Sequence, residues 1–314
     1  MIRSFTITNH LGKKLVLDLE NYESNGILVE SVSGLGQVDS KINLKKMAGT
    51  DFSSVNQATL NDRDIIFKLQ LTDGDSENAQ NLLDSIFVTK QMVTIEVHTD
   101  LRDCYCTGLV EKNEPDMFRP DSMCNITVRC PDPFFYDKIS QTTVFDGIKP
   151  LFYFPFSDSG STEPVDTDEG TIVPSEVQFG EIRIVKDRSV YYTGEDSVGL
   201  TIEIHALGPV SGLIIYNLNT NERMGIDDSK LEAITGHGII EGDTIIINTT
   251  QGQKSMTLIR DGVSINIINA LLKTIDYDWF KLESGDNLFT YTAETGEFEV
   301  MLSIKNRILY KSAV

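Results

Sequence analysis

Residues 198–206 read VGLTIEIHA, and within this stretch apolar and polar side chains alternate. Successive side chains of an extended chain point to opposite faces, so a period of two places all the apolar groups on one side. The pattern predicts a strand of an antiparallel sheet, with one face against a core and the other toward water. The apolar members of this strand are Val198, Leu200, Ile202, Ile204 and Ala206.

The same alternation recurs along most of the chain. It is found in residues 15–19, 65–71, 94–98, 125–130 and 298–304. Turn dipeptides separate such runs in the second half of the sequence. Short strands separated by turns are typical of sandwiches and barrels, so the predicted fold class is mainly β. The turn dipeptides are Asp146-Gly147, Glu169-Gly170, Glu241-Gly242, Asp261-Gly262 and Thr295-Gly296.

One segment has a helical period instead. In SENAQNLLDSIF (residues 76–87) the apolar residues recur at i, i+3, i+4, i+7 and i+8, which makes a single stripe on a helix. Asp75 or Ser76 suits the N-cap, and Glu77 falls in the first turn, where the helix dipole favours an anion. The sequence therefore predicts one amphipathic helix here. Residues 268–273 (IINALL) are a second candidate for a helical turn.

Length and charge limit the class of protein. The chain has 314 residues, of which 40% are hydrophobic, enough for two packed domains. Its net charge is −20, from 47 acidic and 27 basic residues, and this balance opposes binding to nucleic acid or to an anionic membrane. The opening residues MIRSFTITNH lack an apolar signal region, so we expect no secretory signal, no membrane insertion and reduced thiols.

The composition changes near the middle of the chain. The stretch CPDPFFYD (residues 130–137) carries two prolines, which remove ladder donors and end regular pairing. We place a domain boundary after it, which gives domains 1–140 and 141–314. Residues 157–171 (SDSGSTEPVDTDEGT) are acidic and almost without apolar groups, and we interpret them as a mobile loop of the second domain.

Residues suited to catalysis are sparse. The four histidines lie far apart in the sequence and in no metal-binding motif, so solvent exposure is the simpler interpretation for His98 and His205. Asp73-Gly74-Asp75 resembles part of a calcium loop, but capping of the helix explains the acidic residues better. We therefore identify no catalytic, cofactor-binding or metal-binding residue and predict that the chain is not an enzyme.

The four cysteines are Cys104, Cys106, Cys124 and Cys130. Their spacings, C-x-C and C-x₅-C, differ from the C-x₂₋₄-C knuckles of structural zinc sites. Buried free thiols are the favoured interpretation, and a four-thiolate zinc site is the alternative.

Several stretches together resemble the distal tail proteins of long-tailed bacteriophages. They are NITVRCPDPFFYD, the helix of residues 76–87 with the following KQMVTIEV, FGEI (179–182), TGEDSVGLTIEIHALGPVSGLIIYNLNTNERM, GDTIIINTTQGQKSMTLIRDG and WFKLESGDNLFTYTA. Their order covers nearly the whole chain. The long acidic loop and the pair Cys104 and Cys106 depart from the family pattern, and the first forty residues match it loosely.

The resemblance implies an N-terminal split β-barrel with one helix and a C-terminal galectin-like β-sandwich that points outward. It implies a homohexameric ring at the tail tip of a virion, assembled in the bacterial host cytoplasm, for a phage or a phage-tail-like bacteriocin. Its partners would be the tail tube protein, a tail hub or tail-associated lysin-like protein, and receptor-binding or baseplate proteins. DNA would pass through the channel without specific binding, and we expect the channel-facing side to be acidic.

Two other functions stay open at this stage. A carbohydrate-binding β-sandwich that contacts host cell-surface glycans would need an exposed aromatic, and Trp279 is the sole tryptophan. A hydrolase would need a carboxylate pair or a metal site. For ring contacts the candidate surfaces are the helix of residues 76–87 and the polar segment 34–62, which we interpret as a loop.

Overall fold

The computed structural model describes residues 1–21, 26–47, 49, 51–71, 76–116, 122–150, 152–153, 157–158, 180–184, 187–272 and 278–314. Its contacts divide the chain into two compact units. The first contains Met1–Ser140, Gly194–Asp196 and Arg307–Val314, and the second contains Gln141–Thr193 and Ser197–Asn306. Neither unit is continuous in sequence, and the assignment of domains 1–140 and 141–314 remains a prediction.

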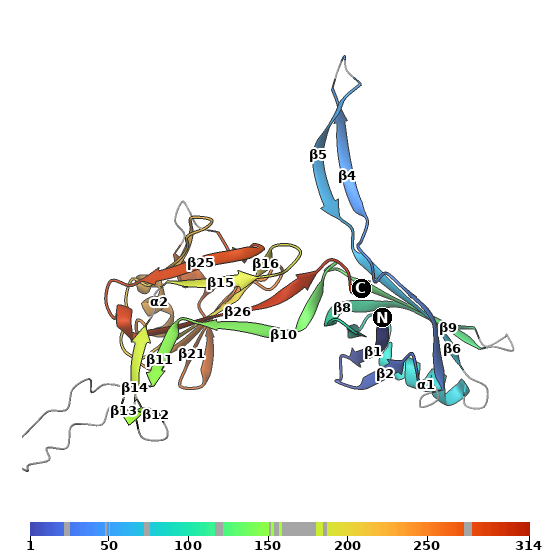
Figure 1. The fold of residues 1–314 in the computed structure, drawn as a ribbon, viewed down its shortest axis with the longest axis horizontal. Helices are drawn as coiled ribbons and strands as arrows, with labels where there is room; N and C mark the ends of the chain where they lie inside the picture. The colour runs from blue at the N-terminus through green and yellow to red at the C-terminus, as the bar shows by residue number, and fades with distance from the viewer. Residues whose placement is uncertain are drawn as a thin grey trace, which may run out of the picture. The chain divides into compact units, whose positions relative to one another are not determined.

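The first unit is a mainly antiparallel sheet with one helix (Figure 1). Its strands are paired in the order β2-β1-β7-β8-β9-β6-β3, and β10 also pairs with the first part of β8. The sheet ends at β2 and β3, so the described strands form no closed barrel. The elements are β1 (Ile2–Asn9), β2 (Lys14–Asp18), β3 (Ile27–Ser33), β4 (Ser40–Lys46), β5 (Ser53–Leu60), β6 (Arg63–Leu71), α1 (Ser76–Ile86), β7 (Met92–Thr99), β8 (Asp103–Asp116), β9 (Met123–Cys130) and β10 (Phe135–Val144).

The predicted helix is confirmed as α1, which covers the inner face of this sheet. Its apolar stripe is buried, and Phe87 just beyond it packs against Phe67 of β6, which in turn meets Phe5 of β1 edge to face at 5.6 Å. The β1–β2 turn is tied to the helix, because the Asn9 side-chain amide donates to the Ser85 carbonyl. Burial of aromatic and aliphatic groups from both layers therefore fixes the helix on the sheet.

The second unit contains a five-stranded antiparallel sheet that packs as a sandwich on part of a larger antiparallel sheet. The five-stranded sheet runs β15-β25-β18-β19-β23, and the part of the larger sheet runs β26-β17-β20-β21-β22. Alternate side chains of both sheets are buried, as in β17, where Ile202 and Ile204 lie inside and His205 is exposed. The Tyr291 hydroxyl of β25 donates to the Val300 carbonyl of β26, which links the two sheets across the core.

Its elements follow in chain order. They are β11 (Asp146–Pro150), β12 (Phe152–Tyr153), β13 (Ser157–Asp158), β14 (Gly180–Ile184), β15 (Arg188–Tyr192), β16 (Val198–Gly199), β17 (Thr201–Ala206), β18 (Ile214–Asn217), β19 (Glu222–Ile226), α2 (Asp228–Thr235), β20 (Thr244–Asn248), β21 (Ser255–Arg260), β22 (Val263–Asn266), the 3₁₀ helix η2 (Ile268–Ala270), β23 (Leu271–Leu272), β24 (Lys281–Leu282), β25 (Gly285–Thr292), the 3₁₀ helix η3 (Glu297–Glu299) and β26 (Val300–Tyr310).

The turn predictions had mixed outcomes. Asp261 and Gly262 both adopt positive φ between β21 and β22, as a tight hairpin turn requires. Asp146 and Gly147 instead belong to β11, where pairing with β14 overrides their turn preference. The strand expected from residue 298 begins at Val300, because residues 297–299 form η3. Residues 169–170 and most of the acidic stretch 157–171 lie outside the described residues.

Helix α2 was not predicted from the sequence, because its short segment lies among strands with period-two alternation. Asp227 caps its N-terminus by accepting from the Lys230 backbone N–H, and Gly236 ends it in the left-handed conformation. These two residues were the available signals, since an Asp before and a Gly after a short segment are typical of helix ends. Residues 268–270 form the expected turn, although as a 3₁₀ helix.

Arg63 is the central polar contact of the first unit. Its side chain is 1% exposed, and the guanidinium donates to the backbone carbonyls of Gly34, Gly36, Pro133 and Lys311. The guanidinium also lies over the Phe135 ring, 4.3 Å from its centroid. One side chain thereby joins β6 to three other segments of the unit.

We expect Arg63→Lys to lower the free energy of unfolding of the first unit by about 2–4 kcal/mol. A lysine keeps the charge but cannot reach four carbonyls with a planar fork, so buried acceptors lose their donors. Urea unfolding followed by circular dichroism measures this. Arg129→Lys is the control, because Arg129 is half-exposed and pairs with Asp64 at 3.0 Å, and its change should stay within about 0.5 kcal/mol. Equal losses in both variants would contradict the assigned role.

Candidate interaction surface

The segment 34–62, which we interpreted as a loop, contains a two-stranded hairpin. Strands β4 and β5 pair with one another and with no other described strand. Figure 1 shows them extending away from the other strands of the first unit. The loop prediction was wrong because Lys, Asn, Ser and Gln residues mask the alternation of the few apolar residues.

The register of this hairpin makes it amphipathic. Leu44 faces Val55, Ile42 faces Ala58 and Ser40 faces Leu60, so these side chains share one face. The pairing skips Asn56, a bulge that keeps Val55 on the same side as Leu44. The opposite face carries the polar pairs Lys41–Thr59, Asn43–Gln57 and Lys45–Ser54.

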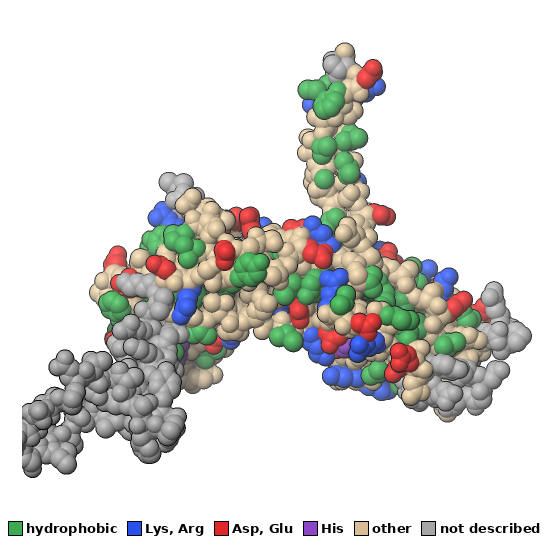
Figure 2. All heavy atoms as spheres, in the orientation of Figure 1, with side chains coloured by type: hydrophobic (Ala, Val, Ile, Leu, Met, Phe, Trp, Pro, Cys, Tyr) green, Lys and Arg blue, Asp and Glu red, His purple; other side chains and the backbone are tan. Residues whose placement is uncertain are grey.

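The apolar face is open to solvent. Leu44 is 62% exposed and Val55 65%, and Met47 and Phe52 near the tip are also exposed. Figure 2 shows hydrophobic side chains spaced along this projection. An isolated two-stranded ribbon has no core of its own, and a row of exposed apolar groups of this kind marks an interaction surface.

The charge of the hairpin differs from that of the chain. Between residues 40 and 60 there are three lysines and one aspartate, a net charge of +2, whereas the whole protein carries −20. The hairpin is thus a basic, apolar projection on an acidic protein, and its electrostatic complement is an acidic surface. We refer to residues 40–60 as the arm.

Helix α1, the other candidate ring surface, exposes mainly polar side chains. Its buried side holds Ala79, Leu83 and Ile86, and its outward side is polar, with Glu77, Asn78, Asn81 and Asp84. Val88 and Met92 beyond its end are exposed apolar residues. The arm is therefore the stronger candidate for a protein contact.

The histidines form no catalytic group. His10, His205 and His237 are exposed, and His98 is half-buried between Thr6 and Asp103, each 3.1 Å away. Among the described residues, no three His, Cys, Asp or Glu side chains are placed to hold a metal ion. The Asp73–Asp75 segment, which resembles a calcium loop, lies outside the described residues.

The four buried cysteines lie in two places, so they do not form a four-thiolate site. Cys104, Cys106 and Cys130 lie on the inner face around Arg63, and Cys130 is paired in register with that arginine. Cys124 is six residues away along β9, about 20 Å at the rise of a strand, and donates to the Asn113 side-chain oxygen at 3.2 Å. Burial raises the pKa of the Cys104 and Cys124 thiols to about 11.

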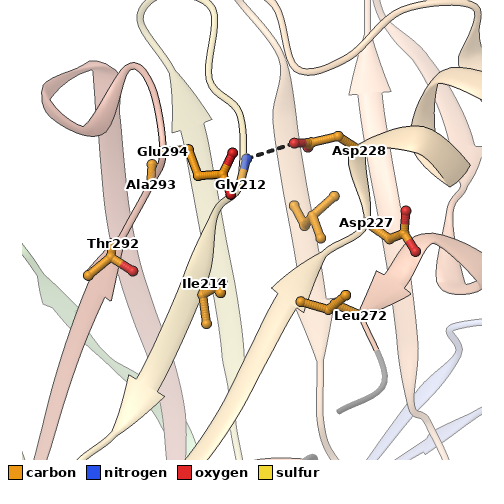
Figure 3. A pocket seen from close by; sticks show the side chains of 9 residues that line it. Gly212, Ile214, Asp227, Asp228, Leu272, Thr292, Ala293 and Glu294 are labelled. Atoms are coloured by element: carbon orange, nitrogen blue, oxygen red, sulfur yellow. Dashed lines mark hydrogen bonds between the residues drawn. The ribbon is translucent and has the colours of Figure 1, made fainter.

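A cavity of about 410 Å³ lies at one end of the sandwich (Figure 3). It is lined by Asp227, Asp228 and Glu294 together with apolar groups. Two of the three carboxylates have local partners: Asp227 caps α2 and pairs with Lys230 at 2.7 Å, and Asp228 accepts from the Gly212 N–H at 2.7 Å. These contacts explain Asp227 and Asp228 as parts of the α2 connection.

Trp279 is half-buried, and the Lys254 ammonium lies over its ring, 5.3 Å from the centroid. A sugar stacks on an open aromatic face, and here a lysine occupies that position. No helix in the described part of the chain is long and apolar enough to cross a membrane.

The comparisons with known proteins place the fold. No family model matches the sequence, and no curated protein matches it. A solved structure of the SPP1 Dit protein (gp 19.1), described as a paradigm of the hub adsorption apparatus in phages that infect Gram-positive bacteria, aligns with a TM-score of 0.62 and 13% identity, over 97% of this chain and 99% of that one. The chain shares its fold with this phage protein.

Two structures of the phage P2 baseplate in its activated conformation also align with this chain. The calcium form aligns with a TM-score of 0.51 and 16% identity, and the strontium form with 0.50 and 14%. Each alignment covers 98% of both chains. The match runs through both units, so the mainly-β expectation and the resemblance to phage tail proteins are supported along the whole length.

We expect the emission of Trp279 to stay unchanged when lactose is added. Lys254 already lies over one face of the ring, so a sugar that stacks there would have to displace the ammonium group. Fluorescence titration measures this, and Lys254→Ala is the control, because uncovering the ring should change the emission without sugar. A saturable shift in the unaltered protein would contradict the expectation and favour the carbohydrate-binding alternative.

Proposed function

We propose that this chain is a structural adaptor of a phage tail tip or baseplate. In this proposal six copies of the chain form a ring, and the chain has no enzymatic activity. The observation that carries the proposal is the alignment of nearly the entire chain with the SPP1 Dit protein. In this role the ring joins the tail tube to the hub and receptor-binding proteins.

The arm supports self-association. Its apolar face requires a cover, and its charge of +2 favours an acidic partner, which a second copy of this chain supplies. The outer edges of β4 and β5 also present unpaired backbone groups, which suit strand addition. Apolar burial and edge pairing together oppose the repulsion between subunits of charge −20.

We expect the double variant Leu44→Ser, Val55→Ser to lose the ring. Burial of a Leu or Val side chain contributes about 1.5–3 kcal/mol, so losing both at each contact weakens association by at least about 100-fold. Native mass spectrometry and negative-stain imaging measure this, with a ring near six times 35.0 kDa for the unaltered protein.

The matched control lies on the other face of the same hairpin. Asn43→Ser with Gln57→Ser changes a directly opposed polar pair and leaves the apolar face intact. This control should assemble as the unaltered protein does, and both variants should melt at the same temperature because their side chains are exposed. A ring that survives loss of Leu44 and Val55, or an unaltered protein that stays monomeric, would contradict the proposal.

We expect ring assembly to increase as the salt concentration rises. An interface held together by ion pairs would instead weaken. Repulsion between subunits extends about 30 Å at 0.01 M salt and about 8 Å at 0.15 M, so we expect more ring at the higher ionic strength. Sedimentation velocity at the two salt concentrations measures the monomer fraction. Dissociation of the ring as salt rises would instead show that attractive charge pairs dominate the contact.

A further inference from the structure

Two buried thiols of the first unit face each other. Cys106 of β8 and Cys130, the last residue of β9, lie with their sulfur atoms 3.9 Å apart, and the Cys130 thiol donates to the Cys106 sulfur. Both residues are at most 1% exposed. These strands are neighbours in the sheet, so the two side chains share one inner face.

A glycine makes room for this approach. The β8–β9 register places Gly108 beside Cys130, and a Cβ on Gly108 would come within 2.7 Å of the Cys130 sulfur. A side chain at this position would therefore displace the Cys130 thiol from its place beside Cys106. Cys106 and Cys130 thus form a close pair of thiols, and Gly108 leaves the space that the Cys130 sulfur occupies.

We propose that Cys106 and Cys130 form an intramolecular disulfide when the folded protein meets a hydroperoxide. The sulfurs must approach from 3.9 Å to the ~2.05 Å of the bond. Cys106 is the diagonal neighbour of Cys130, because Gly108 lies opposite Cys130, so formation of the bond also requires a shift of the backbone at the end of β9. This inference does not rest on the proposed function, because it concerns the first unit of a single chain.

The surroundings favour a thiolate on Cys130. When Cys130 is ionised the direction of the bond is reversed, and the Cys106 thiol donates to the Cys130 thiolate. This hydrogen bond and the positive charge of Arg63 lower the pKa of Cys130, against the opposing effect of burial. The pKa of Cys106 is raised well above its usual value, because that hydrogen bond and its burial both disfavour a second charge. Cys130 is therefore the nucleophile and Cys106 the resolving thiol.

The chemistry balances with hydrogen peroxide as the oxidant. The Cys130 thiolate attacks one peroxide oxygen, the O–O bond breaks, and the products are a sulfenic acid on Cys130 and hydroxide, which takes the Cys130 proton to become water. The Cys106 sulfur then attacks the sulfenic sulfur, the S–S bond forms, and the hydroxyl leaves as water with the Cys106 proton. Two thiols and one peroxide give one disulfide and two waters.

The end of a strand gives the oxidant its access. Cys130 is the last residue of β9, and Pro131 after it has no N–H to continue the ladder. Oxidation requires this end of the strand to open against the hydrogen bond that Arg63 donates to Pro133. Hydrogen peroxide is a small oxidant, so it needs less opening than a bulky disulfide reagent does. Cys124 lies elsewhere with Asn113 as its partner, which makes it the internal reference.

The test uses the full-length protein treated with hydrogen peroxide, then unfolded, alkylated and analysed by mass spectrometry. We expect the treated protein to be two hydrogens lighter before alkylation and to take up two alkyl labels instead of four. Trypsin separates residues 103–112, which hold Cys104 and Cys106, from residues 130–138, and cleavage at Arg129 separates Cys130 from Cys124. The expected product joins the first two peptides through Cys106 and Cys130.

Serine variants make the assignment specific. Cys106→Ser and Cys130→Ser should each abolish the cross-link, and Cys106→Ser should leave a sulfenic acid on Cys130 that a dimedone probe labels. Cys104→Ser and Cys124→Ser should retain the cross-link in full. Four free thiols after treatment, a cross-link through Cys104, or oxidation of Cys130 to a sulfinic acid without any cross-link would overturn the proposal.

Discussion

The first unit depends on one buried guanidinium. Arg63 stands at the start of β6, and its donors reach carbonyls at the base of the arm, at the Pro-rich end of β9 and in the C-terminal tail. A buried cation is costly unless its donors are satisfied, and here four carbonyls and the Phe135 ring satisfy it. Segments that are far apart in sequence are thereby held at a single point.

That point also positions the two features with functional interest. The arm leaves the sheet from the segment that Arg63 holds through Gly34 and Gly36, so a ribbon without a core has a fixed base. The thiols of Cys106 and Cys130 lie on the other side of the same cation and feel its charge. The arm and the pair of thiols thus share one structural anchor.

Several carboxylates of the second unit have partners within the protein. Carboxylates such as Asp227, Asp228 and Asp243 cap a helix, accept from the backbone or pair with Arg260, and these contacts account for them without a substrate. In the proposed ring, the net charge of −20 would oppose contact between copies of the chain, and apolar burial would have to offset it. A scaffold that presents one basic, apolar arm on an acidic body restricts where such burial can occur.

The sequence by itself determined the fold class, the position of helix α1 and most core strands, because periods of two and 3.6 record which face of each element is buried. It did not reveal the arm, since a hairpin exposed on both faces leaves little periodic signal, nor helix α2, whose eight residues are shorter than the pattern needs. Only the tertiary structure decided that Cys130 lies beside Cys106 and that Arg63 joins four segments. Those contacts come from strand register and chain crossings between residues as far apart as 63 and 311, and no local pattern of residue types encodes such distances.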